Sequence, residues 1–425
     1  MVFRLGSLLV FTLLIIISGR YYSDLLRLNP HHNPYLEDVC EDFESYFQKE
    51  MDETHTPGAA LVIVKDTNIL LIKGFGVGNI HTSDSIGVHT AFRIGSLSKG
   101  FASVLAAMLE REGYFDWRDP VQSYVPEFQL KSPKQSDKLT IQHILSQRTG
   151  LPRHAFTNLI EQRVDMNRIY REIRTVNLVG KVGEIYSYQN VAYNLIADIS
   201  EKATGREYVH LLHDHIFTPL KMHDASCSYI GISSTPDKAL PHFSRKGKWK
   251  QARISTKYYN AVPAGGINAS ISDMAIWIKL LLGNRPEIIS PESLDHIFTP
   301  NIFTNNRNRY FHRWPYLKKA YYGMGWRVVQ DAQDTIIYHG GYVNGFRSEI
   351  AINRKERIGI CVLTNAPTEL APRAIPTFMD VYRIHKPGFK KWKQKRHWAF
   401  SITPKHKESS LEIFRKALLS SLHDI

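Results

Sequence analysis

Cysteine is scarce in this chain, and the spacing of its cysteines fits no metal-binding or redox motif. Cys40, Cys227 and Cys361 are the three cysteines in 425 residues, and no two of them form a Cys-x-x-Cys pair. This spacing excludes a cysteine zinc site and a redox-active dithiol. Three cysteines can form at most one disulfide, and their spacing does not show which two would pair. We expect all three to be small buried side chains.

Repeats and metal-binding motifs are also missing. No segment recurs with a period of roughly 20 to 50 residues, which excludes solenoid architectures. His210, His213 and His215 form a histidine cluster, but neither HExxH nor a second ligand cluster accompanies them. Histidines on a helix surface are therefore the better interpretation. We expect no metal and no cofactor.

Acidic residues are outnumbered, 40 against 54 basic residues, which leaves a net charge of +14. The surplus is concentrated near the end, because residues 386–407 contain eight Lys or Arg and no acid. The rest of the chain is only mildly basic, so we expect no nucleic-acid partner. Hydrophobic residues make up 43% of the chain, which is enough for a large core and argues against disorder.

The two ends differ in character from the body. Residues 1–4 are a short basic start, and residues 5–18 are uncharged and apolar, which predicts export. A signal peptide and a retained membrane anchor both remain open for residues 1–22, because the run is short for a span and the cleavage site is unclear. Residues 23–39 are interpreted as a tether. The expected location is the periplasm or another extracytoplasmic space.

The basic tail, residues 386–425, resembles a membrane-interfacial segment, because aromatic residues alternate with its lysines. Four apolar residues fall on one face of a short helix there: Leu411, Phe414, Leu418 and Leu422. A solvated tail is the alternative. We therefore expect the protein to contact a membrane through its N-terminus. A second membrane contact through the tail remains open.

Hydrophobic periodicity divides residues 40–385 into a sheet and a helical lobe. A helix is predicted over residues 41–52, a hairpin over 59–64 and 69–72, and a helix from Ser96 to Gly113. Residues 116–283 are mostly helical. Strand character returns at 321–329, 335–338, 348–352 and 357–364, before a last helix near 370–384. The pattern predicts an α+β fold, an α/β sandwich whose antiparallel sheet is built from both chain ends, flanked by helices, with the helical lobe inserted.

The first motif that carries chemistry is Ser96-Leu-Ser-Lys99. Positions i and i+3 share a helix face, so the amine of Lys99 lies beside the hydroxyl of Ser96. A serine hydroxyl needs a proton acceptor, and a desolvated lysine can be neutral enough to serve. No other serine in the chain has Lys three residues later. The structural alternative is a helix-capping serine followed by a solvent-facing lysine.

Two further motifs are weaker alone. Tyr188-Gln-Asn190 opens a predicted helix, where a phenol near a lysine can pass a proton and a carboxamide can hold a substrate amide; an ordinary helix start is the alternative. His339-Gly-Gly341 follows a strand-like run, where glycine lets a substrate backbone approach and His339 adds a polar or cationic group. The alternative there is a tight hairpin.

In this order, the three motifs resemble those of the superfamily of class C beta-lactamases and low-molecular-weight penicillin-binding proteins. Residues 139–152 and 263–275 resemble linking segments of that family, and the likeness covers roughly residues 40–385. The resemblance implies that Ser96 forms the acyl-enzyme, Lys99 and Tyr188 shuttle its proton, and Asn190, His339 and Gly341 bind substrate. It also implies an oxyanion hole formed by the backbone N–H groups of Ser96 and Tyr342.

Departures from the family's pattern bear on the substrate. Beta-lactamases of this class usually carry Lys at the position of His339, and hydroxyl residues often stand where Tyr342 and Asn344 do, so efficient beta-lactam hydrolysis is not expected. The leading hypothesis is an exported serine hydrolase acting on an amide or ester, such as a D-amino-acid peptide of the cell wall. A class C beta-lactamase and a non-catalytic scaffold are the alternatives.

Overall fold

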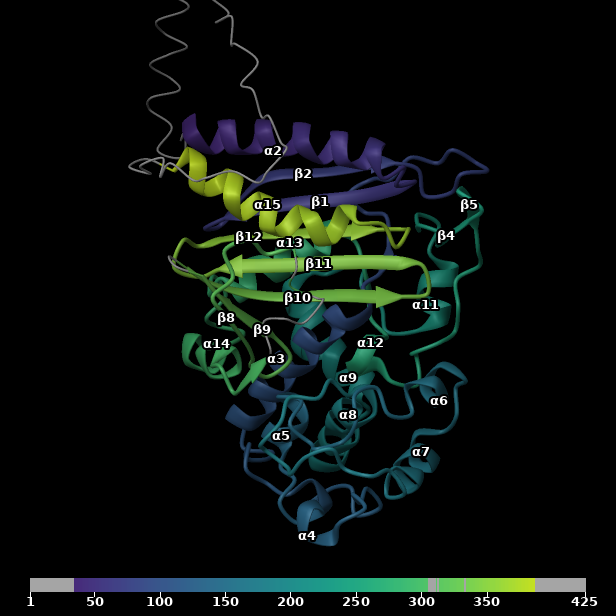
Figure 1. Cartoon of the computed structure of the whole chain (residues 1–425), viewed down its shortest axis with the longest axis vertical. Helices are drawn as coiled ribbons and strands as arrows, with labels where there is room; N and C mark the ends of the chain where they lie inside the picture. The colour runs from purple at the N-terminus through teal and green to yellow at the C-terminus, as the bar shows by residue number, and fades with distance from the viewer. Residues whose placement is uncertain (1–33, 305–310, 312, 332–333, 387–425) are drawn as a thin grey trace, which may run out of the picture. The chain divides into compact units, whose positions relative to one another are not determined.

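The computed structural model describes residues 34–304, 311, 313–331 and 334–386 (Figure 1). The predictions for residues 1–33 and for the tail from residue 387 onward lie outside the described residues. No helix in the described part of the chain is both long and apolar enough to cross a membrane.

The first described helix corrects one boundary. Helix α2 (Pro34–Glu53) begins within the segment predicted as a tether, so residues 34–39 are helical. The reason is packing, because the apolar stripe of this helix starts at Leu36 and Val39 and continues through Phe43 and Phe47 into the core.

The centre of the molecule is an eight-stranded sheet in the order β2-β1-β12-β11-β10-β9-β8-β7, with every neighbouring pair antiparallel. The first strand, β1, lies between β2 and the last strand, β12, and pairs with both, which confirms a sheet closed by both ends of the chain. The strands are β1 (Gly58–Lys65), β2 (Asn68–Gly76), β7 (Ile302–Thr304), β8 (Lys319–Tyr322), β9 (Arg327–Gln330), β10 (Thr335–Val343), β11 (Phe346–Asn353) and β12 (Ile358–Thr364).

Helices cover both faces of this sheet, as an α/β sandwich requires (Figure 1). Successive side chains of β1 enter opposite cores, because a strand alternates its two faces. Ala60 and Val62 pack with the helical lobe, whereas Ala59 and Leu61 pack under α2 and α15 (Leu370–His385). The predicted fold class is confirmed.

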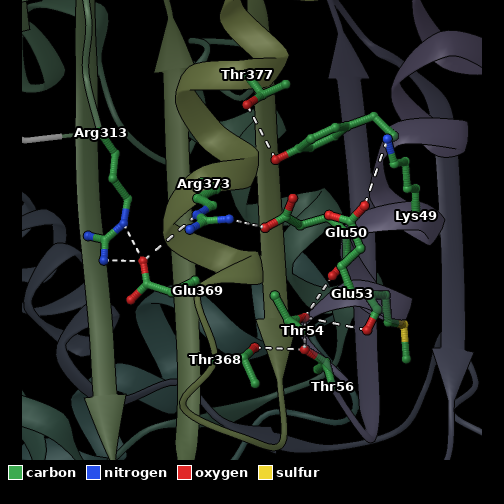
Figure 2. Close-up of polar contacts among 12 residues, drawn as sticks. Lys49, Glu50, Glu53, Thr54, Thr56, Arg313, Thr368, Glu369, Arg373 and Thr377 are labelled. Carbon is green, nitrogen blue, oxygen red and sulfur yellow. Dashed lines mark hydrogen bonds and ion pairs between the residues drawn. The ribbon is translucent and has the colours of Figure 1, made fainter. Parts of the chain in front are cut away.

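Polar contacts join the two helices on the outer face (Figure 2). Arg373 of α15 donates to the carboxylate of Glu50 of α2 at 2.7 Å, and Glu50 is only 1% exposed. At the ends of these helices the hydroxyls of Thr54, Thr56 and Thr368 form a chain with spacings of 2.8 and 2.7 Å. The first and last described helices are thereby fixed to each other.

The lobe between β2 and β7 is mostly helical, as predicted, with two small two-stranded sheets. They are β3 (Phe92–Arg93) with β6 (Asn268–Ala269), and β4 (His242–Arg245) with β5 (Lys248–Gln251). Its helices are α3 (Ser98–Arg111), α4 (Pro133–Ser136), α5 (Ile141–Leu145), α6 (Thr157–Glu161), α7 (Met166–Ile173), α8 (Asn190–Thr204), α9 (Tyr208–Leu212), α10 (Thr218–Leu220), α11 (Tyr229–Ser234), α12 (Val262–Gly265), α13 (Ile271–Leu281) and α14 (Pro291–Phe298).

Two strand predictions were wrong in extent. Residues 321–329 were predicted as one strand, but they belong to the hairpin of β8 and β9, which turns at Gly325 with φ of +76°. The strand predicted to end at Tyr338 continues to Val343, so His339 and Gly341 lie inside β10 and not after it. Glycines suppress the strand signal in the sequence, whereas pairing with β11 keeps the backbone extended.

Candidate active site

Ser96 lies in a short 3-10 turn (Gly95–Leu97) between β3 and α3. The turn begins at Gly95 with φ of +52°, a left-handed conformation that glycine adopts without strain. Ser96 is half-exposed, whereas its neighbours Gly95 and Leu97 are buried. The predicted nucleophile is therefore accessible at the N-terminal end of α3.

Lys99 is fully buried beneath Ser96, in the first turn of α3. Its Nζ is 3.4 Å from the Ser96 Oγ, 2.8 Å from the Asn190 Oδ1 and 2.7 Å from the Ala264 carbonyl oxygen. Burial, and next the charge of Arg327, lowers the pKa of this amine well below its ordinary value. The structural alternative, a solvent-facing lysine, is wrong.

The lowered pKa favours the neutral amine, and the contacts can satisfy its valence. Such an amine has two N–H bonds and one lone pair, and the two carbonyl-type oxygens of Asn190 and Ala264 take the two N–H bonds. The lone pair is then left for the hydroxyl of Ser96. The geometry suits transfer of the serine proton to Lys99.

Tyr188 and Asn190 lie at the start of α8, as the sequence predicts. The Tyr188 ring is nearly buried, and its centroid is 4.8 Å from the Lys99 Nζ. Asn190 contacts Lys99 through its oxygen, while its Nδ2 lies 3.3 Å from the Tyr258 hydroxyl oxygen. Gln189 points away and donates to the Pro152 carbonyl at 2.7 Å, so the middle residue of this motif does not face the site.

His339 is buried beside Tyr188 and is neutral. Burial, and next the charge of Arg327, lowers its pKa well below the ordinary value, which favours the neutral form at neutral pH. Its Nδ1 is 2.9 Å from the Gly340 carbonyl oxygen and donates to it, so Nε2 accepts from the Tyr322 hydroxyl at 3.1 Å. The sequence left open whether His339 is a neutral polar group or a cation, and the structure favours the neutral polar group.

Gly341 and Tyr342 bring the edge of β10 against the serine turn. A Cβ on Gly341 would stand 2.3 Å from the Ile94 carbonyl oxygen and 3.1 Å from the Ser96 amide nitrogen. A Cβ on Gly95 would stand 3.0 Å from the Tyr342 amide nitrogen. The backbones that carry the two predicted oxyanion donors are thus adjacent, while the Tyr342 side chain itself is 52% exposed.

Several residues of the site carried no clear signal in the sequence. Ala264 contributes its carbonyl oxygen, and only the resemblance of residues 263–275 to a family segment pointed there. Arg327 donates to the Tyr186 hydroxyl at 3.0 Å and lies behind Tyr188. A lone arginine in a strand has no motif, so only the fold places it at the site.

The remaining sequence candidates lie elsewhere. His210 and His213 are exposed, and His215 lies 3.5 Å from Glu112. Among the described residues, no three His, Cys, Asp or Glu side chains are grouped to hold a metal ion. The three cysteines, all described, are unbridged, with Cys227 and Cys361 buried and Cys40 half-buried.

Comparisons with known proteins identify the family of this chain. The family described as Beta-lactamase matches residues 43–378. Protein flp of Staphylococcus aureus (strain MW2) is 26% identical over 80% of this chain, and Unguisins hydrolase ungD' of Aspergillus campestris is 24% identical over 81%. The chain spans 65% of the length of each of these relatives.

A solved structure shows the same fold. The octameric penicillin-binding protein homologue from Pyrococcus abyssi superposes with a TM-score of 0.70 at 22% identity, covering 81% of this chain and 80% of that one. The chain belongs to the Beta-lactamase family, whose members are generally serine hydrolases with a fold shared by penicillin-binding proteins.

Proposed function

We propose that this protein is an exported serine hydrolase that cleaves an amide or ester through an acyl-enzyme formed on Ser96. The observation that carries the proposal is the fully buried Lys99 amine, 3.4 Å from the Ser96 Oγ and held by the oxygens of Asn190 and Ala264 at 2.8 and 2.7 Å. A scaffold protein has no physical need for a lysine held in this way at the cost of its desolvation.

The proposed reaction has two halves. The Ser96 oxygen attacks the carbonyl carbon while its proton passes to Lys99, and the oxyanion is held by the N–H groups of Ser96 and Tyr342. Collapse of the intermediate breaks the bond to the leaving group, which takes the proton through Lys99 and Tyr188. Water then attacks the acyl-enzyme and gives up a proton along the same path. When the bond to Ser96 breaks, the serine oxygen takes that proton back and the acid is released.

For the substrate we propose a D-amino-acid peptide or an ester, with a class C beta-lactamase as the alternative activity. The name of the Aspergillus relative, a hydrolase of unguisins, supports hydrolysis in this branch of the family. Because His339 is neutral, it offers no charge to the carboxylate of a beta-lactam, which favours the peptide or ester. Turnover of nitrocefin at an enzymatic rate would support the beta-lactamase instead.

Intact-mass analysis tests the central step. Wild-type protein is exposed to a fluorophosphonate and, separately, to a penicillin, alongside Ser96→Ala and the exposed control Ser123→Ala. We expect adducts on the wild type and on Ser123→Ala, and none on Ser96→Ala. A long-lived penicillin adduct favours the peptidase. A folded wild type that forms no adduct with either reagent would favour the scaffold.

Export and membrane contact are proposals that rest on the sequence of the two ends. Liposome binding of the full chain and of a version ending at His385 tests the tail. We expect weaker binding by the shorter version, and equal binding would remove the tail from the membrane proposal. N-terminal sequencing of the exported protein decides between a cleaved signal and a retained anchor.

A further inference from the structure

Arg327 brings a permanent positive charge into the core of the site. It lies on β9, is only 4% exposed, and donates to the Tyr186 hydroxyl at 3.0 Å. Its guanidinium carbon is 5.7 Å from the ring centroids of both Tyr188 and Tyr322. These rings also contact His339, so the arginine lies directly behind the residues that surround Lys99.

We propose that Arg327 is a positioning residue of the site, whose fixed charge behind Tyr188 keeps the Lys99 amine in its proton-accepting form. This inference rests on the proposed function, because it takes Lys99 as the base for Ser96. Arg327 itself is too buried to contact substrate, so its effect passes through Lys99.

The electrostatic reason is repulsion between like charges across a dry region. A guanidinium does not lose its proton in proteins, so repulsion can be relieved only if its neighbours stay neutral. Interaction between charges is much stronger away from water than in it. Accordingly, the Arg327 charge lowers the pKa of Lys99 beyond the effect of burial, and it lowers the pKa of His339 as well.

The other groups around Lys99 do not supply an opposing charge. The Lys99 Nζ is 5.3 Å from the Tyr193 ring centroid, and His154 in the loop before α6 is close enough to be electrostatically coupled to Lys99. The titratable and charged groups that surround it are Ser96 from the serine turn, Tyr188 and Tyr193 from α8 and its start, His154, Tyr322 from β8, Arg327 from β9 and His339 from β10. Among these described groups none is a carboxylate, and Arg327 alone has a permanent charge. The charge of Arg327 also acts on the buried carboxylate of Glu349 on β11, but that carboxylate is not among the groups that shift Lys99.

A purely structural role for Arg327 is the competing explanation, since its hydrogen bond fixes Tyr186. The two roles differ in pH dependence. Loss of the hydrogen bond to Tyr186 lowers the rate at every pH. Loss of the positive charge instead raises the pKa of Lys99 and moves the acidic limb of the pH–rate profile to higher pH. The pH profile therefore distinguishes them.

The experiment measures the second-order rate of fluorophosphonate labelling from pH 5 to 10, with background taken from Ser96→Ala. The variants are Arg327→Met, Arg327→Lys and Tyr186→Phe, with Arg383→Met as the matched control. Arg383 is another largely buried arginine, but it pairs with Asp331 and Asp334 away from Lys99. Thermal unfolding checks each variant, and Arg327→Gln replaces Arg327→Met if the latter does not fold.

We expect the acidic limb of Arg327→Met to move up by about one pH unit, which lowers the labelling rate below the limb about tenfold. Arg327→Lys and Tyr186→Phe should keep a limb near that of the wild type, because both retain the charge, and Arg383→Met should not move it. An unmoved limb in folded Arg327→Met or Arg327→Gln overturns this inference alone. A folded wild type that is not labelled at any pH overturns the proposed function, and the inference with it.

Discussion

Gly341 lies against the backbone of Ser96, so that a Cβ at position 341 would stand 3.1 Å from the Ser96 amide nitrogen. The same Cβ would meet the Ile94 carbonyl oxygen and the Ser348 Oγ at 2.3 Å. The Ser348 hydroxyl already donates to that carbonyl at 2.6 Å. The strand edge and the serine turn are therefore held together at a distance that only glycine allows.

Gly341→Ala should push β10 away from the serine turn. Because misplacement of a reacting group by about 1 Å can cost about 100-fold in rate, we expect a loss of labelling of that order, with a destabilisation of about 1–3 kcal/mol. Fluorophosphonate labelling and urea unfolding measure the two effects. Gly87→Ala is the control, since its nearest atoms would be 3.7 Å away. Equal losses in both variants would contradict the assignment.

Asn190→Asp should convert Lys99 from a base into an ammonium. The new carboxylate would stand where Oδ1 now lies, 2.8 Å from the Lys99 Nζ, and an adjacent opposite charge raises the pKa of a lysine by roughly 1–3 units. We expect labelling at pH 7 to fall roughly 10- to 1000-fold and its acidic limb to move to higher pH.

Asn194→Asp is the matched control for this change, because it places the same charge one turn later on α8 without a contact to Lys99. It should destabilise the protein yet leave the limb in place. A limb in Asn190→Asp that coincides with that of the wild type would show that Lys99 is not the titrating base.

The buried amine of Lys99 should make stability rise with pH. Its folded pKa is lowered while its unfolded pKa is about 10.4, so between these values the unfolded state binds more protons than the folded state. The free energy of unfolding then increases with pH, with a slope of at most about 1.4 kcal/mol per pH unit. Urea unfolding of the wild type and Lys99→Met at pH 7 and 9.5 measures this. Between pH 7 and 9.5 the free energy of unfolding of the wild type should increase more than that of the variant. Equal changes in the two proteins would refute the lowered pKa of Lys99.

The ion pair of Arg373 and Glu50 should contribute more to stability than the neighbouring surface ion pair of Arg313 and Glu369. Removing Arg373 leaves a carboxylate that is 1% exposed without its partner, whereas Arg313 pairs with Glu369, whose side chain is 49% exposed (Figure 2). We expect Arg373→Met to cost about 1–3 kcal/mol, toward the lower end because Arg373 is itself half-exposed, and Arg313→Met at most about 1 kcal/mol.

Urea unfolding tests this difference, with fluorophosphonate labelling as a check that the site is intact. Adding Glu50→Gln to Arg373→Met should recover part of the loss, because a neutral amide costs less to bury than an unpaired carboxylate. Equal costs for the two arginine variants would mean that water reaches Glu50.

Local pattern was sufficient for the elements whose residues repeat with a clear period. The hairpin of β1 and β2, helix α3 behind Ser96 and the return of the last strands to the first all followed from the sequence. The pattern failed where glycine or a turn interrupts it. Residues 321–329 split at Gly325, and β10 runs through two glycines, because pairing between strands decides extended structure there and a linear pattern does not contain it.

The sequence by itself predicted the pair of Ser96 and Lys99 and the pair of Tyr188 and Asn190, because short spacing fixes which side chains within one motif lie close together. Only the tertiary structure decided the charge states. The neutral His339 and the lowered pKa of Lys99 arise from burial and from Arg327, which is more than 200 residues away from Lys99 along the chain. Burial and long-range charge depend on how distant segments pack, and no local pattern encodes them.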